Sequence, residues 1–406
     1  MSWEYITLGD IASFSNGINF DKSAYSLGIK LISVSDFGNR FSPDFTNLQE
    51  VKKETVREND YLKEGDIVFV RSNGNKELVG RCMLIQHLSQ PVTFSGFVIR
   101  GRIQNTEKYD PVFFTYHFKN IAFRRAMSGT AVGANIQNLS QSRLSAYVAK
   151  IPNIDTQRRI AHILSAYDDL IENNQRQIRL LEEAAQRLYK EWFVDFRFPG
   201  YENTPIVDGV PEGWNSTTMD ETCQAIGGGT PSTSKKEYYE GGNIRWVTPT
   251  DLTKTGSWIL LDTEKKITNE GLDNSSAKML PPDTILMTSR ASIGYIALCE
   301  NEVCTNQGFI SCVPYYEKLR YYLMFNLLNR VDEIKAKATG STFLEISKRT
   351  FREMAIIVPS EQVLMQFDSF ILPVIQKMRT LRKGTESLTK ARDRLLPKLM
   401  SGEMEV

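Results

Sequence analysis

Two long stretches of the chain place apolar residues at alternating steps of four and three positions, as on one face of a long α-helix. The first stretch follows Pro152 and the second follows Pro359. A heptad seam of this kind normally packs against another helix. We therefore predict two long helices, over residues 153–195 and 359–406. The expected seam residues, which also serve as candidates for partner docking, are Ile160, Leu164, Ile171, Ile178, Leu181 and Leu188 in the first helix and Ile371, Val374, Leu381, Leu388 and Leu395 in the second.

Each predicted helix is expected to pack against the other. The first would span about 36 residues and about 54 Å, and neither helix can bury its apolar stripe alone. Because a globular region separates them in the sequence, the pair can run antiparallel as a coiled coil. The alternative is that each helix packs only on its own globular domain.

Three residues are unfavourable in the two predicted helices. Asn174 is a polar seam residue of the kind that fixes register. In the second helix, Pro373 removes a backbone donor and Gly384 lowers helix propensity. We expect the regular part of that helix to begin near Pro373.

The regions before the two helices alternate short apolar runs with turns rich in Gly, Ser, Thr and Asn. This pattern is typical of mixed α+β domains. The fold class that we predict is therefore α+β, with two globular domains separated by two long helices. The expected boundaries are 1–152 for the first globular domain, 153–195 for the central helix, 196–358 for a connector and the second globular domain, and 359–406 for the C-terminal helix.

Motifs of the first half recur in the same order in the second half. Thr93–Phe97 corresponds to Thr305–Phe309, and Ile151-Pro152 corresponds to Val358-Pro359. Offsets of roughly 205 to 218 residues are far longer than the 20–50 residues of solenoid repeats, so they indicate a duplicated domain.

Composition and charge leave several partners open. The chain has 406 residues, of which 41% are hydrophobic and 24% are charged, as in folded globular proteins. No apolar run reaches the roughly 20 residues that cross a bilayer, and no secretory signal opens the chain, so we expect a cytoplasmic protein without membrane contact. A net charge of +1 neither requires nor excludes nucleic acid, because binding depends on local clusters of charge.

The cysteines predict neither a disulfide framework nor a metal site. They are odd in number and scattered, and none forms a Cys-x-x-Cys pair. With only three histidines to supplement them, we expect no metal ligands. The cysteines are Cys82, Cys223, Cys299, Cys304 and Cys312.

One short motif matches a metal-dependent nuclease pattern. Pro43-Asp44 and Glu50-Val51-Lys52 fit the Pro-Asp and Glu-x-Lys elements that hold a metal and activate water. In the second copy, Ser257 and Thr263 stand opposite the two carboxylates. Because these residues cannot bind a metal in the same way, we interpret the match as chance.

Other catalytic motifs are missing from the sequence. There is no Gly-x-x-x-x-Gly-Lys-Ser/Thr loop for ATP, and the glycine-rich segment Gly227–Ser232 predicts a backbone-exposing loop. Asp110-Pro111 predicts the start of a helix. We expect no catalytic residue and no cofactor in this chain.

Polar residues gather in the turns that follow equivalent predicted strands. Arg71–Lys76 follows one strand, and Ser289–Ser292 follows its counterpart. Such side chains can contact base edges and phosphates, although solvated loops are also polar. The candidate DNA-binding residues are Arg71, Ser72, Asn73, Lys76, Ser95 and Thr130 in the first half and Thr230, Ser232, Thr250, Ser289, Arg290, Asn306, Gln307 and Thr342 in the second.

Taken in order, these motifs resemble one family over essentially the whole chain. They are the Gly213-Trp214 opening of the second half, the Gly229–Ser232 loop, the Thr288–Gly294 segment, the Thr305–Phe309 segment and the Pro-to-Gln entries to the helices. The sequence resembles the specificity (S) subunits of type I restriction-modification systems. The first half departs from the pattern at Phe94-Ser95, where the family often has Asn-Gln, and in its Gly17 loop.

The resemblance implies that each globular domain is a target recognition domain that reads half of a split sequence in double-stranded DNA. The helices would then form the spacer and dock two methyltransferase (M) subunits, joined by restriction (R) subunits. S-adenosylmethionine, ATP and Mg would belong to those partners, and this chain would be non-catalytic. The alternatives are a nuclease or methyltransferase that acts alone, or a coiled-coil scaffold without a role on DNA.

Overall fold

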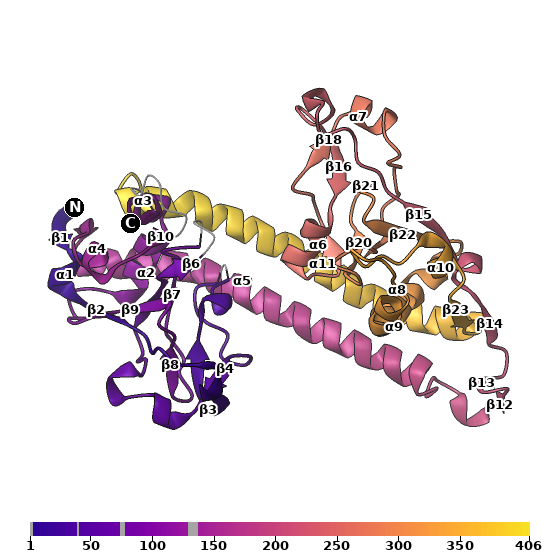
Figure 1. Ribbon diagram of the computed structural model, residues 1–406, viewed down its shortest axis with the longest axis horizontal. Coiled ribbons are helices and arrows are strands. Elements are labelled where there is room, and N and C mark those ends of the chain that lie inside the picture. Colours follow the sequence, from indigo (N-terminus) through magenta and orange to yellow (C-terminus); the bar gives the residue numbers. More distant parts are fainter. Residues whose placement is uncertain (1–2, 39, 74–77, 129–136) are drawn as a thin grey trace. The chain divides into compact units, whose positions relative to one another are not determined.

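The computed structural model describes residues 3–38, 40–73, 78–128 and 137–406 (Figure 1). Its contacts divide the chain into two compact units. Unit 1 comprises Met1–Glu172 and Glu386–Val406, and unit 2 comprises Asn173–Thr385. Each unit therefore contains one globular domain and part of each long helix.

The duplication reappears as one strand order in the larger sheets. Unit 1 has the order β2-β9-β5-β7, and unit 2 has the order β15-β22-β19-β20 with β17 added at the edge. In unit 1 the bounds are Ala12–Asn16 (β2), Val98–Ile103 (β9), Ile67–Val70 (β5) and Cys82–Leu84 (β7). In unit 2 they are Cys223–Gly227 (β15), Phe309–Pro314 (β22), Ile285–Thr288 (β19), Ile296–Cys299 (β20) and Ile259–Leu260 (β17).

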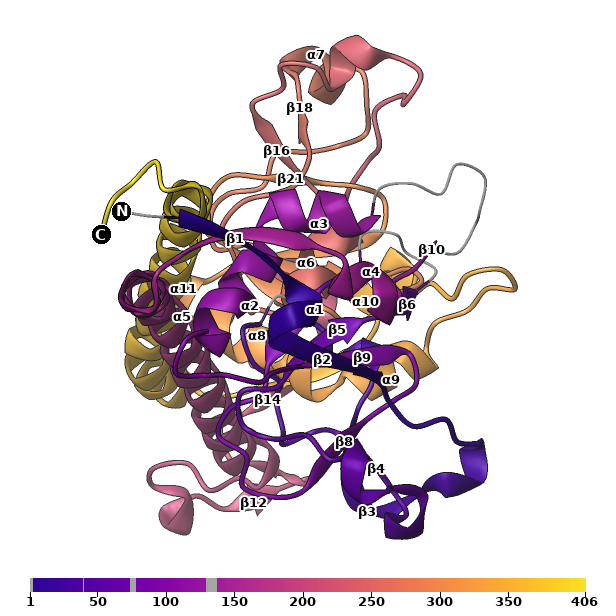
Figure 2. The same ribbon diagram turned by 90° about the vertical axis from the view of Figure 1, so that its left-hand side faces the viewer.

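A smaller sheet also appears in both units with the same directions. In each, the central strand has one antiparallel and one parallel neighbour. Within its own unit, each small sheet lies away from the long helices (Figures 1 and 2). The orders are β4-β3-β8 and β18-β16-β21. The bounds are Gln49–Val51 (β4), Tyr25–Ile32 (β3), Val92–Phe94 (β8), Lys266–Ile267 (β18), Ile244–Val247 (β16) and Cys304–Thr305 (β21).

Paired strands and short helices complete each unit. The pairs β1-β11 and β14-β23 link the start of each globular domain to the strand before its long helix, and β12-β13 lies in the connector. Their bounds are Trp3–Thr7 (β1), Val148–Pro152 (β11), Asn215–Thr218 (β14), Ala355–Val358 (β23), Ile206–Val207 (β12) and Val210–Pro211 (β13). The helices are Leu8–Ile11 (α1), Pro111–Lys119 (α2), Ile121–Ser128 (α3), Gln141–Ser145 (α4), Pro249–Thr255 (α6), Asn269–Asp273 (α7), Arg320–Asn329 (α8), Val331–Ala336 (α9) and Lys348–Arg352 (α10).

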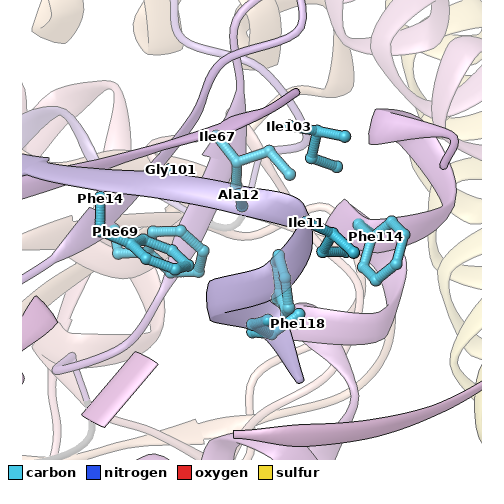
Figure 3. Close-up of a pocket in the computed structure, with 10 residues that line it drawn as sticks. Ile11, Ala12, Phe14, Ile67, Phe69, Gly101, Ile103, Phe114 and Phe118 are labelled. Carbon is cyan, nitrogen blue, oxygen red and sulfur yellow. The ribbon is translucent and has the colours of Figure 1, made fainter. Parts of the chain in front are cut away.

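A small apolar void lies in the core of unit 1 between the larger sheet and α2 (Figure 3). Its volume is about 10 Å³. A side chain at Gly101 would meet the Phe14 ring at 2.9 Å, so the glycine lets aromatic residues pack over β9. Because its lining is apolar and it has room for about one water, we interpret the void as core packing and not as a ligand site.

The two long helices are α5 (Ile154–Tyr189), which continues into a π-helical turn at Lys190–Val194, and α11 (Glu361–Ser401). In unit 1 the first part of α5 shares a core with the last part of α11, where Leu164 and Leu399 are buried together. In unit 2 the last part of α5 meets the first part of α11, and the rings of Phe193 and Phe367 lie 4.8 Å apart. The contacts run in opposite sequence order, so the helices pair antiparallel.

The predicted seam residues face the interior of their units. The buried ones are Ile160, Leu164, Ile171, Ile178, Ile371 and Leu381, and the half-buried ones are Leu181, Leu188, Val374, Leu388 and Leu395. The helices also pack on their globular domains, because Tyr189 stacks on Phe325 of α8 with the ring centroids 5.9 Å apart. The helices therefore pack on each other, as predicted, and on their globular domains as well, so the alternative that each packs only on its own domain is wrong.

The expectation that the second helix becomes regular only near Pro373 is wrong, because α11 is helical from Glu361. A proline inside a helix costs about 3 kcal/mol. In the segment before it, Val363, Leu364 and Phe367 are buried, and burial of each such side chain contributes about 1.5–3 kcal/mol. Packing therefore outweighs the lost backbone hydrogen bond.

Asn174 and Gly384 face each other in the seam of unit 2. A side chain added at Gly384 would meet the Asn174 amide nitrogen at 3.5 Å, an ordinary contact distance. The glycine is thus not required by crowding, and the polar seam residue lies where the opposite helix has no side chain.

Glu182 carries a buried carboxyl group on α5. Burial raises its pKa from 4.5 to about 7, although a backbone hydrogen bond with Trp258 and the charges of Arg382 and Arg179 oppose the shift. Because the folded state holds the proton more tightly, unit 2 should lose stability as pH rises from about 4.5 to 7. Glu182→Gln should therefore raise the melting temperature at pH 8 and leave it almost unchanged at pH 4.

Thermal unfolding monitored by circular dichroism at both pH values measures this difference. Glu183→Gln is the matched control, because Glu183 is the next residue on α5 and its side chain is 59% exposed. An equal change in melting temperature at pH 4 and pH 8 would contradict the role of the Glu182 proton.

Candidate nucleic-acid interface

In unit 2, four segments from distant parts of the sequence lie side by side, each joined to the next by a backbone hydrogen bond. Gly229 N–H donates to the Thr305 carbonyl at 2.9 Å, which joins the glycine-rich loop to β21. Ser289 N–H donates to the Gly308 carbonyl at 2.8 Å, and Ile346 N–H donates to the Ser289 carbonyl at 3.0 Å. We name the segments 228–230, 305–308, 288–291 and 343–346 the second polar edge.

Unit 1 repeats this succession. Ile18 N–H donates to the Phe94 carbonyl at 2.9 Å, and Arg71 N–H donates to the Phe97 carbonyl at 2.8 Å. Leu139 N–H then donates to the Arg71 carbonyl at 2.8 Å, next to the pairing of β6 (Ser72–Asn73) with β10 (Gln137–Asn138) (Figure 2). We name the segments 17–19, 94–97, 71–73 and 137–139 the first polar edge.

A glycine is required at the same place in both edges. A side chain at Gly17 would lie 2.2 Å from the Phe94 carbonyl oxygen and 2.4 Å from that of Ser95. At Gly228 it would lie 2.2 Å from the carbonyl oxygens of Thr305 and Asn306. The backbone must therefore approach the neighbouring segment closely in both units.

Gly228→Ala should displace the glycine-rich loop from β21 in unit 2. Forcing an extra methyl group into a packed site typically costs about 1–3 kcal/mol, and the loss should appear in thermal unfolding. Gly38→Ala is a suitable control, because a side chain there meets nothing closer than the Arg40 side chain at 3.9 Å. Equal stability of the Gly228 and Gly38 variants would show that the loop relaxes without cost.

The second polar edge brings together several of the predicted residues. The Thr230 hydroxyl donates to the Gln307 side-chain oxygen, although 77 positions separate them in the sequence. The Asn306 side chain accepts from Gly308 N–H at 2.9 Å, which orders the turn. Arg290 lies 3.7 Å from the Glu345 carboxylate. These groups are half-buried or exposed and can hydrogen-bond a ligand.

The first polar edge differs at Arg71. Its backbone N–H occupies the position of Ser289, and its side chain donates to the Gly96 carbonyl at 3.0 Å. Arg71 and Arg290 are therefore not equivalent positions, although both follow the same strand of the duplicated sheet. Ser72, which aligns with Arg290, is half-buried.

The remaining candidates fall into three groups. Ser95 and Ser289 are buried, so their hydroxyl groups face the interior. Lys76, Thr130 and the side chain of Asn73 lie outside the described residues. Thr250, Ser232 and Thr342 are exposed in or beside the loops of unit 2.

Two features of the edges were not predicted from the sequence. The Lys348 amine lies 3.3 Å from the place where a side chain at Gly227 would stand, beside the glycine-rich loop. Phe97 is 64% exposed and Phe343 is 57% exposed. Apolar residues usually lie in the core, and only the hydrogen-bonded turns around these two reveal their exposure.

The nuclease-like motif does not form a carboxylate cluster. Asp44 pairs with Arg40 at 2.8 Å, and hydrogen bonds from Arg40 and Thr46 lower its pKa to about 2. Glu50 accepts instead from Gly28 N–H at 2.8 Å. No group of three His, Cys, Asp or Glu side chains that could hold a metal occurs in the described part of the chain.

The cysteines are buried free thiols. Burial raises the pKa of Cys82 and Cys299 to about 11 and that of Cys304 to about 12, which keeps these thiols protonated at neutral pH. Among the described residues, no helix is both long and apolar enough to span a membrane.

Comparison with known proteins assigns the chain to a family. The family model described as the type I restriction modification DNA specificity domain matches residues 1–183 and 211–370. These ranges cover most of the chain and contain both polar edges. The chain belongs to this family of specificity subunits, as the order of its motifs predicted.

Individual relatives agree. The HindI specificity subunit of Haemophilus influenzae is 25% identical over 99% of both chains, and the MjaIX specificity subunit of Methanocaldococcus jannaschii is 34% identical over 44% of each. The crystal structure of the S subunit from M. genitalium covers 98% of this chain and 96% of its own, with 17% identity and a TM-score of 0.61. The predicted α+β fold and the assignment as a non-catalytic specificity subunit are confirmed.

Proposed function

We propose that this chain reads a bipartite DNA sequence, with one half-site at each polar edge. The observation that carries the proposal is the repetition of the same four-segment edge, with hydrogen-bonding side chains, in both units of a DNA specificity chain. Arg, Asn, Gln, Ser and Thr are the side chains that read base edges and phosphates. The two edges differ in sequence, which suits two different half-sites.

The long helices support a role in spacing the half-sites. At 1.5 Å per residue, the 36 residues of α5 span about 54 Å. Two domains that read major grooves on one face of DNA are separated by about one turn, or about 34 Å. Half-sites of a few base pairs then leave a gap of about 6 base pairs. This estimate rests on the groove spacing.

We further propose that two methyltransferase subunits dock on the chain and that restriction subunits join them. Of the predicted seam residues, the half-buried ones retain surface for a partner, and the buried ones do not. On the helices of unit 2, Leu180, Met365 and Phe370 are 56%, 59% and 57% exposed. S-adenosylmethionine, ATP and Mg belong in this proposal to the partner subunits.

The test is genome-wide mapping of methylated adenines in cells that carry the methyltransferase subunits with and without this chain. A bipartite methylated sequence that appears only with the chain is expected. The purified chain alone should transfer no methyl group from S-adenosylmethionine and should cut no DNA. Activity of the chain alone would favour a stand-alone enzyme, and unchanged methylation would favour a scaffold.

Arg290→Ala tests the assignment of the second edge. Loss of a base contact should weaken binding by about 1–3 kcal/mol and relax the sequence at one position of one half-site. Loss of a phosphate contact would instead weaken binding to all sequences alike. Unchanged affinity for every half-site variant in a binding titration would contradict the assignment.

A further inference from the structure

We infer that Phe343 and Phe97 are apolar base-contacting residues, each specific for one half-site of the proposed target. This inference rests on the proposed function. All 21 phenylalanines lie among the described residues, and only Phe97, Phe343 and Phe370 are exposed. Two of these three lie on the polar edges. An exposed ring forgoes the stabilisation that its burial would give the fold, so exposure at these positions calls for a functional reason.

Phe343 lies at the tip of a short, closed hairpin. Thr339 and Glu345 exchange both backbone hydrogen bonds, at 3.0 and 2.9 Å. A side chain at Gly340 would lie 2.3 Å from the Phe343 carbonyl oxygen, so the turn depends on this glycine. The hairpin holds an apolar tip outward, where Leu344 is also 53% exposed.

The tip of this hairpin is tied to the polar groups of the second edge. Ala291 N–H donates to the Leu344 carbonyl at 2.9 Å. The backbone of Ala291 is in the left-handed region, with φ of 59°. The Arg290 guanidinium lies over the Phe343 ring, 5.9 Å from its centroid. An apolar ring beside a cation and hydrogen-bonding groups suits a thymine in the major groove, where the C5-methyl group lies next to a hydrogen-bond acceptor.

Phe97 is held on the first edge by a different turn. Val98 N–H donates to the Ser95 carbonyl at 2.9 Å, and the Phe97 carbonyl accepts from Arg71. Gly96 N–H donates to the Ile18 carbonyl at 2.7 Å, which ties the turn to the segment 17–19. The exposed ring at position 97 therefore projects from a fixed backbone.

The two rings occupy different segments of equivalent edges. Phe97 corresponds to Gly308 by its hydrogen bonding, so the sequence alignment of Thr93–Phe97 with Thr305–Phe309 is wrong by one position. Phe343 belongs to the segment that joins Ser289. The backbone scaffold is thus the same in both units, while the exposed phenylalanine stands on a different segment in each. This arrangement is expected when one scaffold reads two different half-sequences, and it distinguishes base contact from a shared structural role.

The experiment uses the full chain in complex with its methyltransferase subunits and DNA that carries the mapped target. Phe343→Ala should weaken binding to the target by roughly 10- to 100-fold, as expected from the loss of a buried phenylalanine contact. Binding to non-target DNA should not change. The slope of log affinity against log salt should also stay the same, because no phosphate contact is lost. Phe97→Ala should act in the same way on the other half-site.

Matched controls are Tyr316→Ala in unit 2 and Tyr5→Ala in unit 1. These rings are 63% and 72% exposed, and Tyr316 follows β22 at the end opposite Gly308. Equal affinity of Phe343→Ala and Tyr316→Ala for the target would overturn the inference. Equal losses on target and non-target DNA, or loss of co-purifying methyltransferase, would also overturn it. A wild-type complex that does not prefer its mapped site would instead contradict the proposed function.

Discussion

Replacing Asp168 by alanine is expected to lower the free energy of unfolding of unit 1 by about 3–5 kcal/mol, the usual cost of leaving a buried charge unpaired. The Asp168 and Arg392 side chains are 11% and 12% exposed and form an ion pair between α5 and α11. The Tyr116 hydroxyl donates to the same carboxylate at 2.6 Å. The substitution takes the carboxylate away from both Tyr116 and Arg392. Arg392 then retains its pair with Asp393, whose side chain is 57% exposed. Denaturant titration followed by circular dichroism measures the loss.

Asp169→Ala is the control for this effect. Asp169 is the next residue on α5 and is exposed, so its loss should change stability by less than about 0.5 kcal/mol. The double variant Asp168→Ala with Arg392→Leu should recover most of the stability, because it leaves no unpaired buried charge. A double variant less stable than Asp168→Ala would show that the ion pair is not what couples these positions.

The Asp168–Arg392 ion pair shows what heptad periodicity can predict from the sequence and what it cannot. The steps of four and three predicted both helices, and between Leu388 and Leu395 the same steps fall on Arg392. They did not predict what neutralises its charge, because Asp168 lies one position beyond Tyr167, the place that the steps assign to the seam between Leu164 and Ile171. Likewise, local propensity made Pro373 a helix breaker, whereas burial of Val363 and Phe367 extends the helix through it.

The polar edges were predicted only in part, for a different physical reason. The repeated motifs located the strands and turns, but each side chain's direction depends on backbone hydrogen bonds between distant segments. The sequence placed Arg71–Lys76 and Ser289–Ser292 after equivalent strands. The hydrogen bonds that Arg71 and Ser289 donate to the carbonyls of residues 97 and 308 show that these two residues occupy the same position. An apolar residue such as Phe97 predicts a core position unless the turn that exposes it is known.

The second prediction concerns the spacing between the two half-sites. It rests on the proposed function. Insertion of one heptad in both long helices should change the gap by about 3 base pairs, because seven helical residues add about 10 Å. The structure indicates where to insert. Unit 1 uses α5 up to Glu172 and α11 from Glu386, so insertions after Asn174 and Gly384 leave its contacts intact. The heptad step keeps the seam facing its partner.

Methylation mapping of the heptad variant, in complex with its methyltransferase subunits, measures the gap. The two half-sequences should stay the same because both polar edges are unaltered, while their separation changes and one half-site rotates by nearly a third of a turn around the duplex. A five-residue insertion at the same two places is the control. It turns each seam away from its partner, so it should unfold the helix pair and abolish methylation. An unaltered gap with full activity in the heptad variant would show that the partner subunits, and not these helices, set the spacing.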